Sequence, residues 1–503
     1  MICLIMQREY ILTFDLGTTA IKMVIFDRNI NAIYTDDYPL KTYERDGHQV
    51  QKAEDWWEGI KTLCMRLKND DKINRKKIAA ISSTGQMEDC LLLDVRGEPL
   101  TEVLLYSDGR AEKECELLKE LFGKDYLERI TGNNFDPLMS INKYLYLREN
   151  RADLFSKHSY LITGAKDFLN FRLTGNNITD YTNAATTGFL DIIRGEWNTY
   201  LLEELNLDRS FLPHLQKASS MAGSLSDRAA AELNLPAGIP VINGAGDLGA
   251  STLGAGALKE GDIYCYLGTT GWLATPAGSV SANKNIFSLS NVDGNGYILA
   301  GAILNAGKTY DWYLLKILAA GEKMAQIPAE EYRRVEERIS SIPAGSEGIL
   351  FFPFLSGERS PVKIKENNGG FIGLGTKSGR YEMLRAVLEG VGFSLKHNLR
   401  EMLGEEEHPR QINMIGGGSR SNIWPQILAD ILNLDINILE LKAGAPSLGA
   451  ALIAFRALGW IDDYDEIKEG FVVKGRFHPV KENVREYVKI FARYLSYLEK
   501  LYL

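Results

Sequence analysis

The sequence predicts an α/β protein built from two similar domains. Its 503 residues exceed the size of one ordinary hydrophobic core, so we expect two large domains. A strand, a Leu-Gly-Thr-Thr turn and a second strand occur twice, over residues 11–26 and 262–275, which indicates an internal duplication. In the second half of the chain, predicted strands alternate with predicted helices, as in an α/β sheet. Each domain should therefore open with a hairpin whose turn is Gly-Thr-Thr.

The first half of the chain begins with three short segments rich in β-branched and aromatic residues, separated by turn residues. This arrangement predicts an antiparallel meander, followed by a helix with two adjacent tryptophans and then by further strands. The strands are expected over residues 10–17, 20–27, 31–40, 78–86, 90–97 and 239–247, the helix over 53–70, and a mostly helical region over 108–175.

The second half also contains segments with helical spacing. Apolar residues three and four positions apart predict two long helices, and the last of them should pack as a terminal helix. Residues 412–439 have the pattern of a strand, three glycines, a helix and a strand. Besides that segment, we expect strands over 262–275 and 297–304 and helices over 381–399 and 484–501.

Composition narrows the classes of partner. Apolar residues make up 45% and charged residues 24% of the chain, as in a globular protein. A net charge of −9 and a pI near 5.5 argue against binding to nucleic acid or to an anionic membrane, since both require clustered Lys and Arg. No signal peptide or membrane span is evident. We expect a cytoplasmic protein that acts on small molecules, with a homodimer as one option for its assembly and its five cysteines as buried free thiols.

The two Gly-Thr-Thr turns are candidates for binding phosphate. Each turn exposes backbone N–H groups and two hydroxyl groups, which can donate hydrogen bonds to phosphate oxygens without a Walker loop. Asp15 lies just before the first turn and is a natural ligand for a Mg²⁺ ion on those phosphates, usually through water. The matching context of the two turns favours this interpretation over that of ordinary turns.

Two other segments have features of nucleotide-binding loops. Gly416–Gly418 lie between a predicted strand and a helix, so the backbone can approach a flat ligand closely, although close packing of the strand on the helix explains the same pattern. Residues 302–309, AILNAGKT, fit a loose Walker A pattern that ends in Lys308 and Thr309. Apolar residues within this loop weigh against a true P-loop.

Residues 241–251, VINGAGDLGAS, contain a possible dinucleotide fingerprint. Gly244, Gly246 and Gly249 have the G-x-G-x-x-G spacing of a Rossmann turn that follows a strand. However, Asp247 lies inside the fingerprint, where its carboxylate would repel a pyrophosphate. The fingerprint is therefore the weaker of two functional interpretations, and an NAD(P)-dependent oxidoreductase is the remote alternative.

The stronger interpretation makes Asp247 a catalytic base. In a Rossmann unit the ribose-binding acid should end the next strand, whereas Glu260 and Asp262 precede a strand that ends in glycine. In a catalytic loop, the small residues around Asp247 would leave room for a substrate whose hydroxyl proton the carboxylate accepts during attack on a phosphoryl group. A solvated turn aspartate is the third alternative.

Eight motifs occur in the order in which the FGGY carbohydrate kinases carry their equivalents, and the chain resembles this family over residues 9–460. Among the branches of the family, it most resembles the xylulokinases, with gluconokinases and glycerol kinases more distant. The motifs are FDLGTT, SSTGQMEDCLLLD, LYSDGR, AKDFLNFRLTG, NGAGDLGAS, YLGTTGW, FLSGERSP and IGGGSRSNIW.

The resemblance implies an ATP-dependent sugar kinase with Mg²⁺ as its cofactor. Its fold would be two actin-like, ribonuclease H-like ATPase domains, over residues 1–254 and 255–503, with ATP and sugar meeting in the cleft between them. Asp247 corresponds to the catalytic base of the family, and Asp15 together with Asp247 to its metal-associated carboxylates. The resemblance assigns nucleotide binding to Thr18, Thr19, Lys22, Gly268, Thr269, Thr270, Gly307, Asp311, Gly417, Gly418 and Asn422.

The sugar site departs from the family pattern. The resemblance assigns sugar contacts to Met87, Glu88, Asp247 and Leu248, but xylulokinases have His at the position of Glu88 and Asn at that of Leu248. Loss of a polar group beside the base removes a hydrogen bond to a substrate hydroxyl, which can decide specificity. Leu138 replaces a tyrosine of glycerol kinases and argues against glycerol. A ketopentose such as D-xylulose is the expected substrate, with another sugar, a polyol or an aldonate such as gluconate as the alternative, and a non-catalytic ATP-binding scaffold as a further rival.

Overall fold

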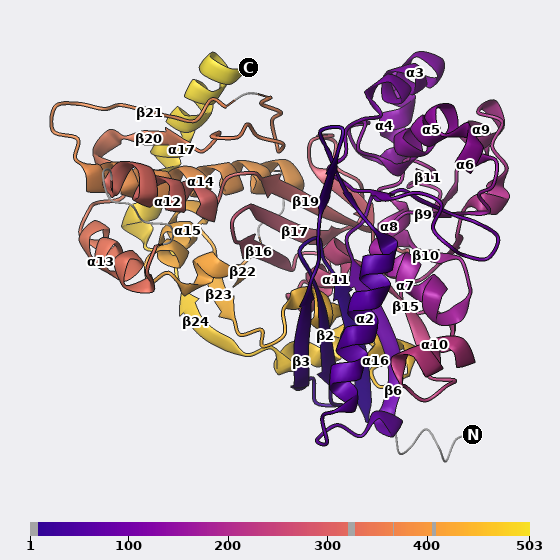
Figure 1. Cartoon of the computed structure of the whole chain (residues 1–503). Coiled ribbons are helices and arrows are strands. Elements are labelled where there is room, and N and C mark those ends of the chain that lie inside the picture. Colours follow the sequence, from indigo (N-terminus) through magenta and orange to yellow (C-terminus); the bar gives the residue numbers. More distant parts are fainter. Residues whose placement is uncertain (1–8, 320–326, 366, 405–408) are drawn as a thin grey trace.

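The computed structural model describes residues 9–319, 327–365, 367–404 and 409–503. It consists of two lobes, each built around one mixed β-sheet with helices on both faces (Figure 1). Both faces of the central strands are buried because their side chains alternate between two cores. In the first strand, for example, Leu12 and Phe14 enter one core and Ile11 enters the other. The α/β class predicted from the sequence is confirmed.

The first lobe contains a six-stranded sheet in the order β14-β15-β6-β1-β2-β3. Strands β1, β2 and β3 form the predicted antiparallel meander, and β6 and β15 run parallel to β1. The strands are β1 (Tyr10–Leu16), β2 (Ala20–Phe26), β3 (Ala32–Pro39), β6 (Ile78–Gly85), β14 (Met221–Ser224) and β15 (Pro240–Gly246).

The second lobe contains a seven-stranded sheet in the order β18-β19-β17-β16-β22-β23-β24. Strands β16 and β17 are antiparallel, and β22 and β23 continue the sheet parallel to β16. The strands are β16 (Ile263–Leu267), β17 (Gly271–Ala277), β18 (Phe287–Ser290), β19 (Tyr297–Ile303), β22 (Gln411–Ile415), β23 (Asp435–Leu439) and β24 (Val473–Phe477).

The two sheets share one topology. The order β3-β2-β1-β6-β15 in the first lobe corresponds to β19-β17-β16-β22-β23 in the second, and an antiparallel strand, β14 or β24, closes the far edge of each. The residues between β1 and β2, and between β16 and β17, are the two Gly-Thr-Thr turns. The internal duplication predicted from these turns is therefore present in the fold.

Helices cover the first sheet on both faces. On one face, α2 packs against β2 and β3 while α7 packs against β6 and β15; on the other, α11 and α16 lie side by side. Helix α2 buries Trp56, Ile60 and Leu63 along one stripe, as its sequence periodicity predicts. The helices are α2 (Ala53–Lys68), α7 (Ala165–Thr174), α10 (Asp227–Leu233), α11 (Asp247–Gly254) and α16 (Ala445–Ala457).

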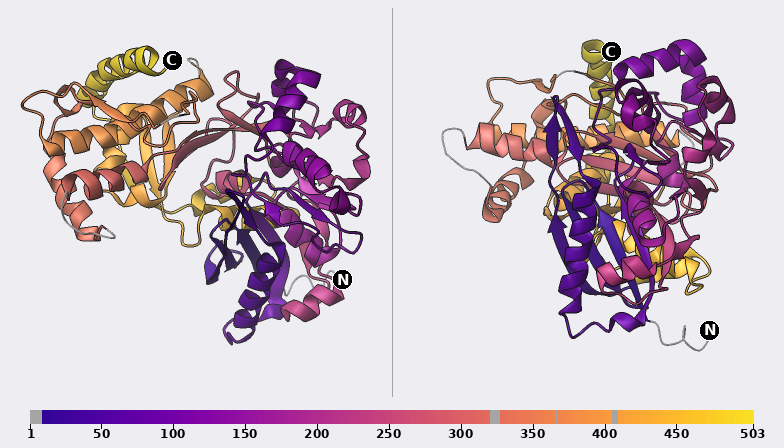
Figure 2. Two further views of the ribbon diagram at one scale, coloured as in Figure 1. Left: turned by 45° about the horizontal axis from the view of Figure 1, so that its top comes forward. Right: turned by 45° about the vertical axis from the view of Figure 1, so that its right-hand side comes forward.

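The second sheet has a helical layer on one face and part of the first lobe on the other. Long helices, including the predicted terminal helix, form the outer layer (Figure 2). The inner face shares a core with α3, α4 and α5, which lie in the helical region predicted within residues 108–175. The helices are α3 (Glu112–Phe122), α4 (Lys124–Thr131), α5 (Ser140–Asn150), α12 (Gly307–Tyr313), α13 (Ala329–Ser340), α14 (Arg380–Leu403), α15 (Trp424–Leu432) and α17 (Lys481–Tyr502).

The region between β6 and β14 also contains small elements that complete the first lobe. Two short strands, β7 and β9, pair with each other, and β10 leads directly into α8. These elements are β7 (Leu91–Leu93), β8 (Val103–Leu104), α6 (Ala152–Phe155), β9 (Tyr160–Ile162), β10 (Ile178–Asp180), α8 (Tyr181–Ala184), β11 (Leu190–Asp191), β12 (Glu196–Trp197), α9 (Thr199–Glu204) and β13 (His214–Gln216).

Two predictions about composition can be compared with the structure. Cys64, Cys90, Cys115 and Cys265 are buried free thiols, whereas Cys3 lies outside the described residues. Among the helices of the described residues, none combines the length and apolar character that crossing a membrane requires.

Helix α16 links the two halves of the sequence. It follows β23 of the second sheet, yet its apolar residues pack against β1, β6 and β15 of the first sheet. It crosses α11 at backbone contact: a Cβ atom added to Gly449 would lie 1.8 Å from the carbonyl oxygen of Ala250, and one added to Gly254 would lie 1.9 Å from that of Ala445. These distances leave no room for a side chain at either glycine.

We predict that Gly449→Ala lowers the free energy of unfolding by roughly 1–3 kcal/mol, because one helix must shift to admit the methyl group. Urea and thermal denaturation of the purified variant measure this loss. Gly375→Ala is the matched control, since a Cβ atom there meets no heavy atom within 4 Å. Equal stabilities of the two variants would show that the helix crossing is not tight.

Candidate active site

The carboxyl ends of the parallel strands of the first sheet bring two aspartates to one edge. Asp15, near the end of β1, pairs in register with Thr84 of β6, and Thr84 pairs with Ala245 near the end of β15. Asp247 is the first residue of α11, directly after β15. Residues 232 positions apart in the chain therefore lie at the same edge because parallel strands end together.

Burial makes the ionised form of both carboxyl groups unfavourable. Burial raises the pKa of Asp15 to about 6, although the ammonium group of Lys22 lowers it. Burial and the negative charge of Asp15 raise the pKa of Asp247 to about 7. A pair of neighbouring carboxylates that resist full ionisation is an arrangement found at functional sites, where a proton or a cation can relieve the repulsion.

The orientation of the Asp247 side chain is fixed locally. The backbone N–H of Leu248 donates a hydrogen bond of 2.7 Å to Oδ1 of Asp247. The Leu248 carbonyl in turn accepts a hydrogen bond of 2.7 Å from the hydroxyl of Thr252, one turn further along α11. One oxygen of the Asp247 carboxylate is therefore held by an amide of its own helix.

The glycines around Asp247 have a different role from the one predicted. We expected them to leave room for a substrate, but protein groups fill this space. An added Cβ atom would lie 1.8 Å from the carbonyl oxygen of Ser83 at Gly244, 2.0 Å from Sδ of Met87 at Gly246, and 2.7 Å from the Thr182 methyl group at Gly249. The glycines instead permit close packing behind Asp247. The prediction that they leave room for a substrate is wrong because residues from distant segments fill this space.

The dinucleotide interpretation of this segment is also wrong. A Rossmann fingerprint requires the strand before the glycines and the strand after the helix to be parallel neighbours in one sheet. Here β15 belongs to the first sheet and β16 to the second. Glu260 and Asp262 precede β16 and are thus separated from any such turn by the fold itself.

The first Gly-Thr-Thr turn lies beside Asp15 and is held by hydrogen bonds to two glutamine side chains. The hydroxyl of Thr18 donates a hydrogen bond of 3.0 Å to the side-chain oxygen of Gln86, and the Thr18 carbonyl accepts one of 2.7 Å from Gln51. Thr19 is exposed, and Lys22 pairs with Asp15 across the hairpin. The turn is anchored through Thr18 and presents Thr19 to solvent.

The second turn is supported by the Walker-like segment. The backbone N–H of Gly307 donates to the carbonyl of Gly268 at 2.8 Å, and the amides of Ala306 and Lys308 both donate to the carbonyl of Thr269 at 3.1 Å. A phosphate cradle would need these amides free, so residues 302–309 are a support for the turn and not a P-loop. Thr269 and Thr270 are exposed at its tip, next to Gly307.

The remaining nucleotide candidates lie beyond this turn on the second lobe. Gly418 packs on Leu267, the residue before the turn, whereas a Cβ atom at Gly417 would meet open space. The backbone N–H of Asn422 donates a hydrogen bond of 2.9 Å to Oε2 of Glu336. Asp311 of α12 accepts a hydrogen bond of 2.6 Å from the hydroxyl of Tyr332 on α13. The structure thus places Gly417 and Gly418 next to the second turn and ties Asp311 and Asn422 to the helix α13.

The sugar candidates Met87 and Glu88 lie between the lobes. Glu88 has a φ of 64°, a strained left-handed conformation for a residue with a side chain. Burial and the charge of Asp136 raise its pKa to about 8, while Lys143 and Arg359 act in the opposite direction. Because Arg359 belongs to the second half of the chain, this site is assembled from both lobes.

Two of these neighbours are residues that sequence reasoning did not single out as site residues. Asp136 follows the helix α4, in the region between β6 and β14, and Lys143 lies on α5 with its ammonium group buried. Lys143 donates hydrogen bonds of 2.7 and 2.6 Å to the carbonyls of Glu88 and Leu105. It therefore fixes the strained backbone of Glu88. Arg359 lies in the motif FLSGERSP, one of the eight motifs shared with the FGGY kinases, and this motif could have pointed to it.

The donor set at the sheet edge fits a hard cation that a nucleotide brings with it. Within the described residues, no three His, Cys, Asp or Glu side chains group as a metal site. Asp15 and Asp247 would supply two carboxylates, which is the usual protein contribution to Mg²⁺ when phosphate oxygens and water complete the shell.

Comparisons with known proteins agree along the whole chain. Residues 10–254 match the N-terminal domain, and residues 263–458 the C-terminal domain, of the FGGY family of carbohydrate kinases. A xylulose kinase of Bacillus subtilis is 30% identical over 493 residues, which are 97% of this chain and 96% of that one. Solved structures of a ligand-bound xylulose kinase and of a gluconate kinase, both from Lactobacillus acidophilus, each have a TM-score of 0.89, 28% identity and coverage of 98% of both chains.

We predict that Asp247→Asn stabilises the protein at pH 8 and not at pH 4. The folded state raises the pKa of Asp247 from 3.8 to about 7, so its contribution to stability is fully present below pH 3.8 and is lost as pH rises through 7. Removing the charge should raise Tm at pH 8 by about 2–5 °C, as thermal denaturation without ligands can measure. Asp46→Asn, on the exposed surface, is the control. An equal Tm for wild type and Asp247→Asn at pH 8 would contradict the electrostatic account.

Proposed function

The chain belongs to the FGGY family of carbohydrate kinases, and from this premise we propose that it transfers the γ-phosphoryl group of ATP to a hydroxyl of a small uncharged sugar, with D-xylulose as the expected substrate. Family membership makes it a sugar kinase with the two-domain, actin-like fold of that family. The observation that carries the proposed chemistry is the Asp247 carboxyl group at the sheet edge beside Asp15, with a pKa raised to about 7.

In this proposal Asp247 is the general base. A base works best when its pKa lies near the operating pH, because it is then both deprotonated and basic enough to accept a hydroxyl proton. The Leu248 amide holds Oδ1, so we assign the proton to Oδ2. The position of Asp247 at the N-terminus of α11 keeps the carboxyl group aimed in one direction, which contributes to catalysis through orientation.

The phosphates are assigned to the two Gly-Thr-Thr turns. Thr19 on one lobe and Thr269 and Thr270 on the other expose hydroxyl groups and turn amides that can donate hydrogen bonds to phosphate oxygens. Asp15 and Asp247 would hold Mg²⁺, which when bound neutralises the charge of the phosphate oxygens. Gly417 and Gly418 would adjoin the adenosine, because open space lies next to Gly417. We place this reaction in the cytoplasm, where ATP is available.

The charges around Glu88 favour an uncharged substrate. Glu88 interacts with the like charge of Asp136, and the buried ammonium group of Lys143 is already bound to two carbonyls. A substrate carboxylate placed here would add a third acidic group, and like charges at such distances are unfavourable in a partly buried site. A ketopentose offers hydroxyl groups that Glu88 can bind in either protonation state.

Gluconate is the second candidate, and two observations favour it. The gluconate kinase of Lactobacillus acidophilus is as similar to this chain as the xylulose kinase of the same organism. In addition, Arg359 could compensate a substrate carboxylate near Glu88. A panel of ketopentoses, ketohexoses, polyols and aldonates, tested for sugar-dependent release of ADP, separates the two candidates.

We predict that Asp247→Asn lowers kcat by about 10² or more while the affinity for ATP stays within a few-fold of wild type, since the variant loses the base but retains both turns and Asp15, the other carboxylate assigned to Mg²⁺. Steady-state kinetics with the best sugar and calorimetric titration of ATP provide both values. A variant with near-normal kcat would refute the role of Asp247.

We also predict that the preference for D-xylulose over D-gluconate grows between pH 7 and pH 9. Glu88 loses its proton near pH 8 and then repels a substrate carboxylate, and the ratio of the two kcat/KM values cancels the titration of the common base. In Glu88→Gln this ratio should stay constant with pH. A ratio that is independent of pH in the wild type, or gluconate as the better substrate, would contradict the assignment.

A further inference from the structure

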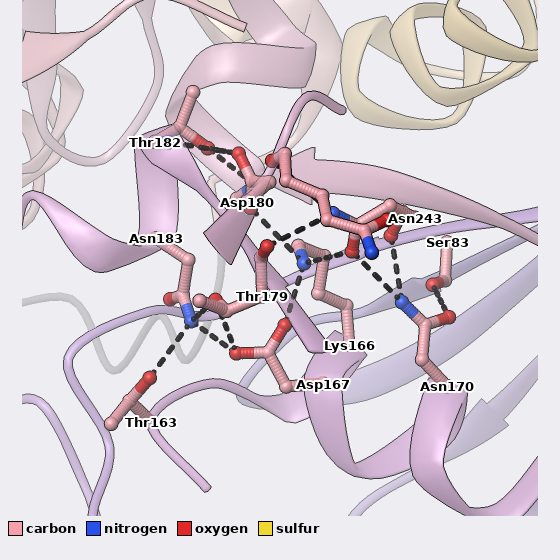
Figure 3. Close-up of polar contacts among 12 residues, drawn as sticks. Ser83, Thr163, Lys166, Asp167, Asn170, Thr179, Asp180, Thr182, Asn183 and Asn243 are labelled. Carbon is pink, nitrogen blue, oxygen red and sulfur yellow. Dashed lines mark hydrogen bonds and ion pairs between the residues drawn. The ribbon is translucent and has the colours of Figure 1, made fainter. Parts of the chain in front are cut away.

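Figure 3 shows a buried network of ion pairs and hydrogen bonds around Lys166, which includes Asp167, Asp180 and Asn243 of β15. The ammonium group of Lys166 on α7 lies 2.6 Å from Oδ1 of Asp167 and 3.0 Å from Oδ1 of Asp180, and all three side chains are at most 1% exposed. Burial lowers the pKa of Lys166, but the two carboxylates outweigh it and keep the ammonium group charged. The network thus holds an ammonium group and two carboxyl groups away from water.

The network is connected to the segment that contains Asp247 through the hydroxyl group of Thr182. Oδ2 of Asp180 accepts hydrogen bonds from the backbone N–H of Thr182, at 2.8 Å, and from the Thr182 hydroxyl. Since the hydroxyl hydrogen is directed to Asp180, a lone pair of Oγ1 is free to accept. The backbone N–H of Gly246 donates to this oxygen at 2.8 Å. Gly246 is the last residue of β15 and the residue directly before Asp247.

Thr182 also contacts the first turn of α11 through its methyl group. A Cβ atom at Gly249 would lie 2.7 Å from this methyl group, and one at Gly246 would lie 3.2 Å from the hydroxyl oxygen. The two glycines lie one and two residues from Asp247 on either side. The side chain of Thr182 therefore contacts the chain on both sides of Asp247, and it is fully buried.

A second connection holds the same strand three residues earlier. The side-chain amide of Asn243 donates to the carbonyl of Thr179 at 3.0 Å, and Lys166 donates to its amide oxygen at 3.4 Å. Asn170 donates to the Asn243 carbonyl at 2.8 Å. Lys166 thus contributes to both connections, and the end of β15 is fixed at two points by one network.

We propose that Thr182, oriented by Asp180 and Lys166, is a positioning residue for Asp247: its hydroxyl group fixes the direction of the Gly246 amide and with it the start of α11. This inference rests on the proposed role of Asp247 as the base. Thr182 does not itself act on the substrate. It acts through the backbone, because the first N–H groups of a helix have no partner within the helix and need one outside it.

The chemistry of the network supports a positioning role over a purely stabilising one. Buried charges are costly to desolvate, and apolar residues of similar size often stabilise a protein as well or better. A hydrogen bond, unlike an apolar contact, fixes a direction, and displacement of a catalytic group by about 1 Å can cost 10²-fold in rate. A charged network that ends at the residue before Asp247 fits a demand for geometry.

The test compares Thr182→Val with Thr182→Ser. Valine keeps the shape and removes the hydroxyl group, so kcat should fall about 10- to 100-fold while KM for ATP and for the sugar changes less than about threefold. Serine keeps the hydroxyl group and should restore kcat to within about threefold of wild type. Thr186→Val is the matched control: Thr186 is equally buried, but its hydroxyl donates only to the nearby carbonyl of Asn183. Its kcat should stay unchanged.

A second readout is independent of kinase activity. Amide hydrogen exchange over residues 243–250 should be faster in Thr182→Val than in wild type, Thr182→Ser or Thr186→Val, because the Gly246 amide loses its acceptor. Unchanged exchange in Thr182→Val, or loss of kcat in Thr186→Val to the same extent, would overturn the proposal. If Thr182→Val does not fold, Thr182→Cys, with its weaker hydrogen-bonding thiol, is compared with Thr182→Ser in the same way.

The two proposals fail in different ways. If the function proposed for Asp247 is wrong, Asp247→Asn retains kcat or no sugar stimulates ADP release from the wild type. If only the role of Thr182 is wrong, Asp247→Asn is inactive while Thr182→Val retains both the wild-type kcat and slow exchange over residues 243–250.

Discussion

The backbone contact between α11 and α16 determines how the two lobes meet. Gly254 and Gly449 allow each helix to touch a carbonyl of the other, so the helices lie closer than side chains would permit. Helix α11 begins with Asp247 of the first lobe, and α16 comes from the second half of the chain. Strand β15 of the first sheet leads into α11, and β23 of the second sheet is followed by α16. The helix pair therefore fixes the two sheets relative to each other, and Arg359 of the second half of the chain interacts with Glu88 of the first lobe.

Duplication of one topology explains the division of labour in the site. Each sheet presents a Gly-Thr-Thr turn at the carboxyl end of its central strand, so two equivalent turns become available for one chain of phosphates. The lobes differ in their insertions. The helical region of the first lobe supplies Asp136 and Lys143 near Glu88, whereas the second lobe supports its turn with the start of α12. In the proposed function, the repeated parts bind the nucleotide and the unique parts bind the sugar.

The features that the sequence predicted correctly are those written in local patterns. The meander, the two turns and the long helices follow from periodicity and turn residues within about twenty positions. The position of Asp247 after β15 is also local. The site residues that were missed depend on contacts between distant segments: Lys143 lies 55 positions from Glu88, and Thr182 lies 64 positions from Gly246. The glycines near Asp247 were misinterpreted because the groups that fill their space, such as Ser83, are far away in the chain.

The packing of α16 on the first sheet has a consequence for biosynthesis. Strands β1, β6 and β15 are complete by residue 246, but the apolar surface that α16 covers remains open until residue 457 has been translated. An emerging N-terminal half therefore exposes one face of its sheet while about two hundred further residues leave the ribosome, the situation in which nascent chains depend on chaperones. The same order makes a premature stop before α16 a defect of the first lobe as well as of the second.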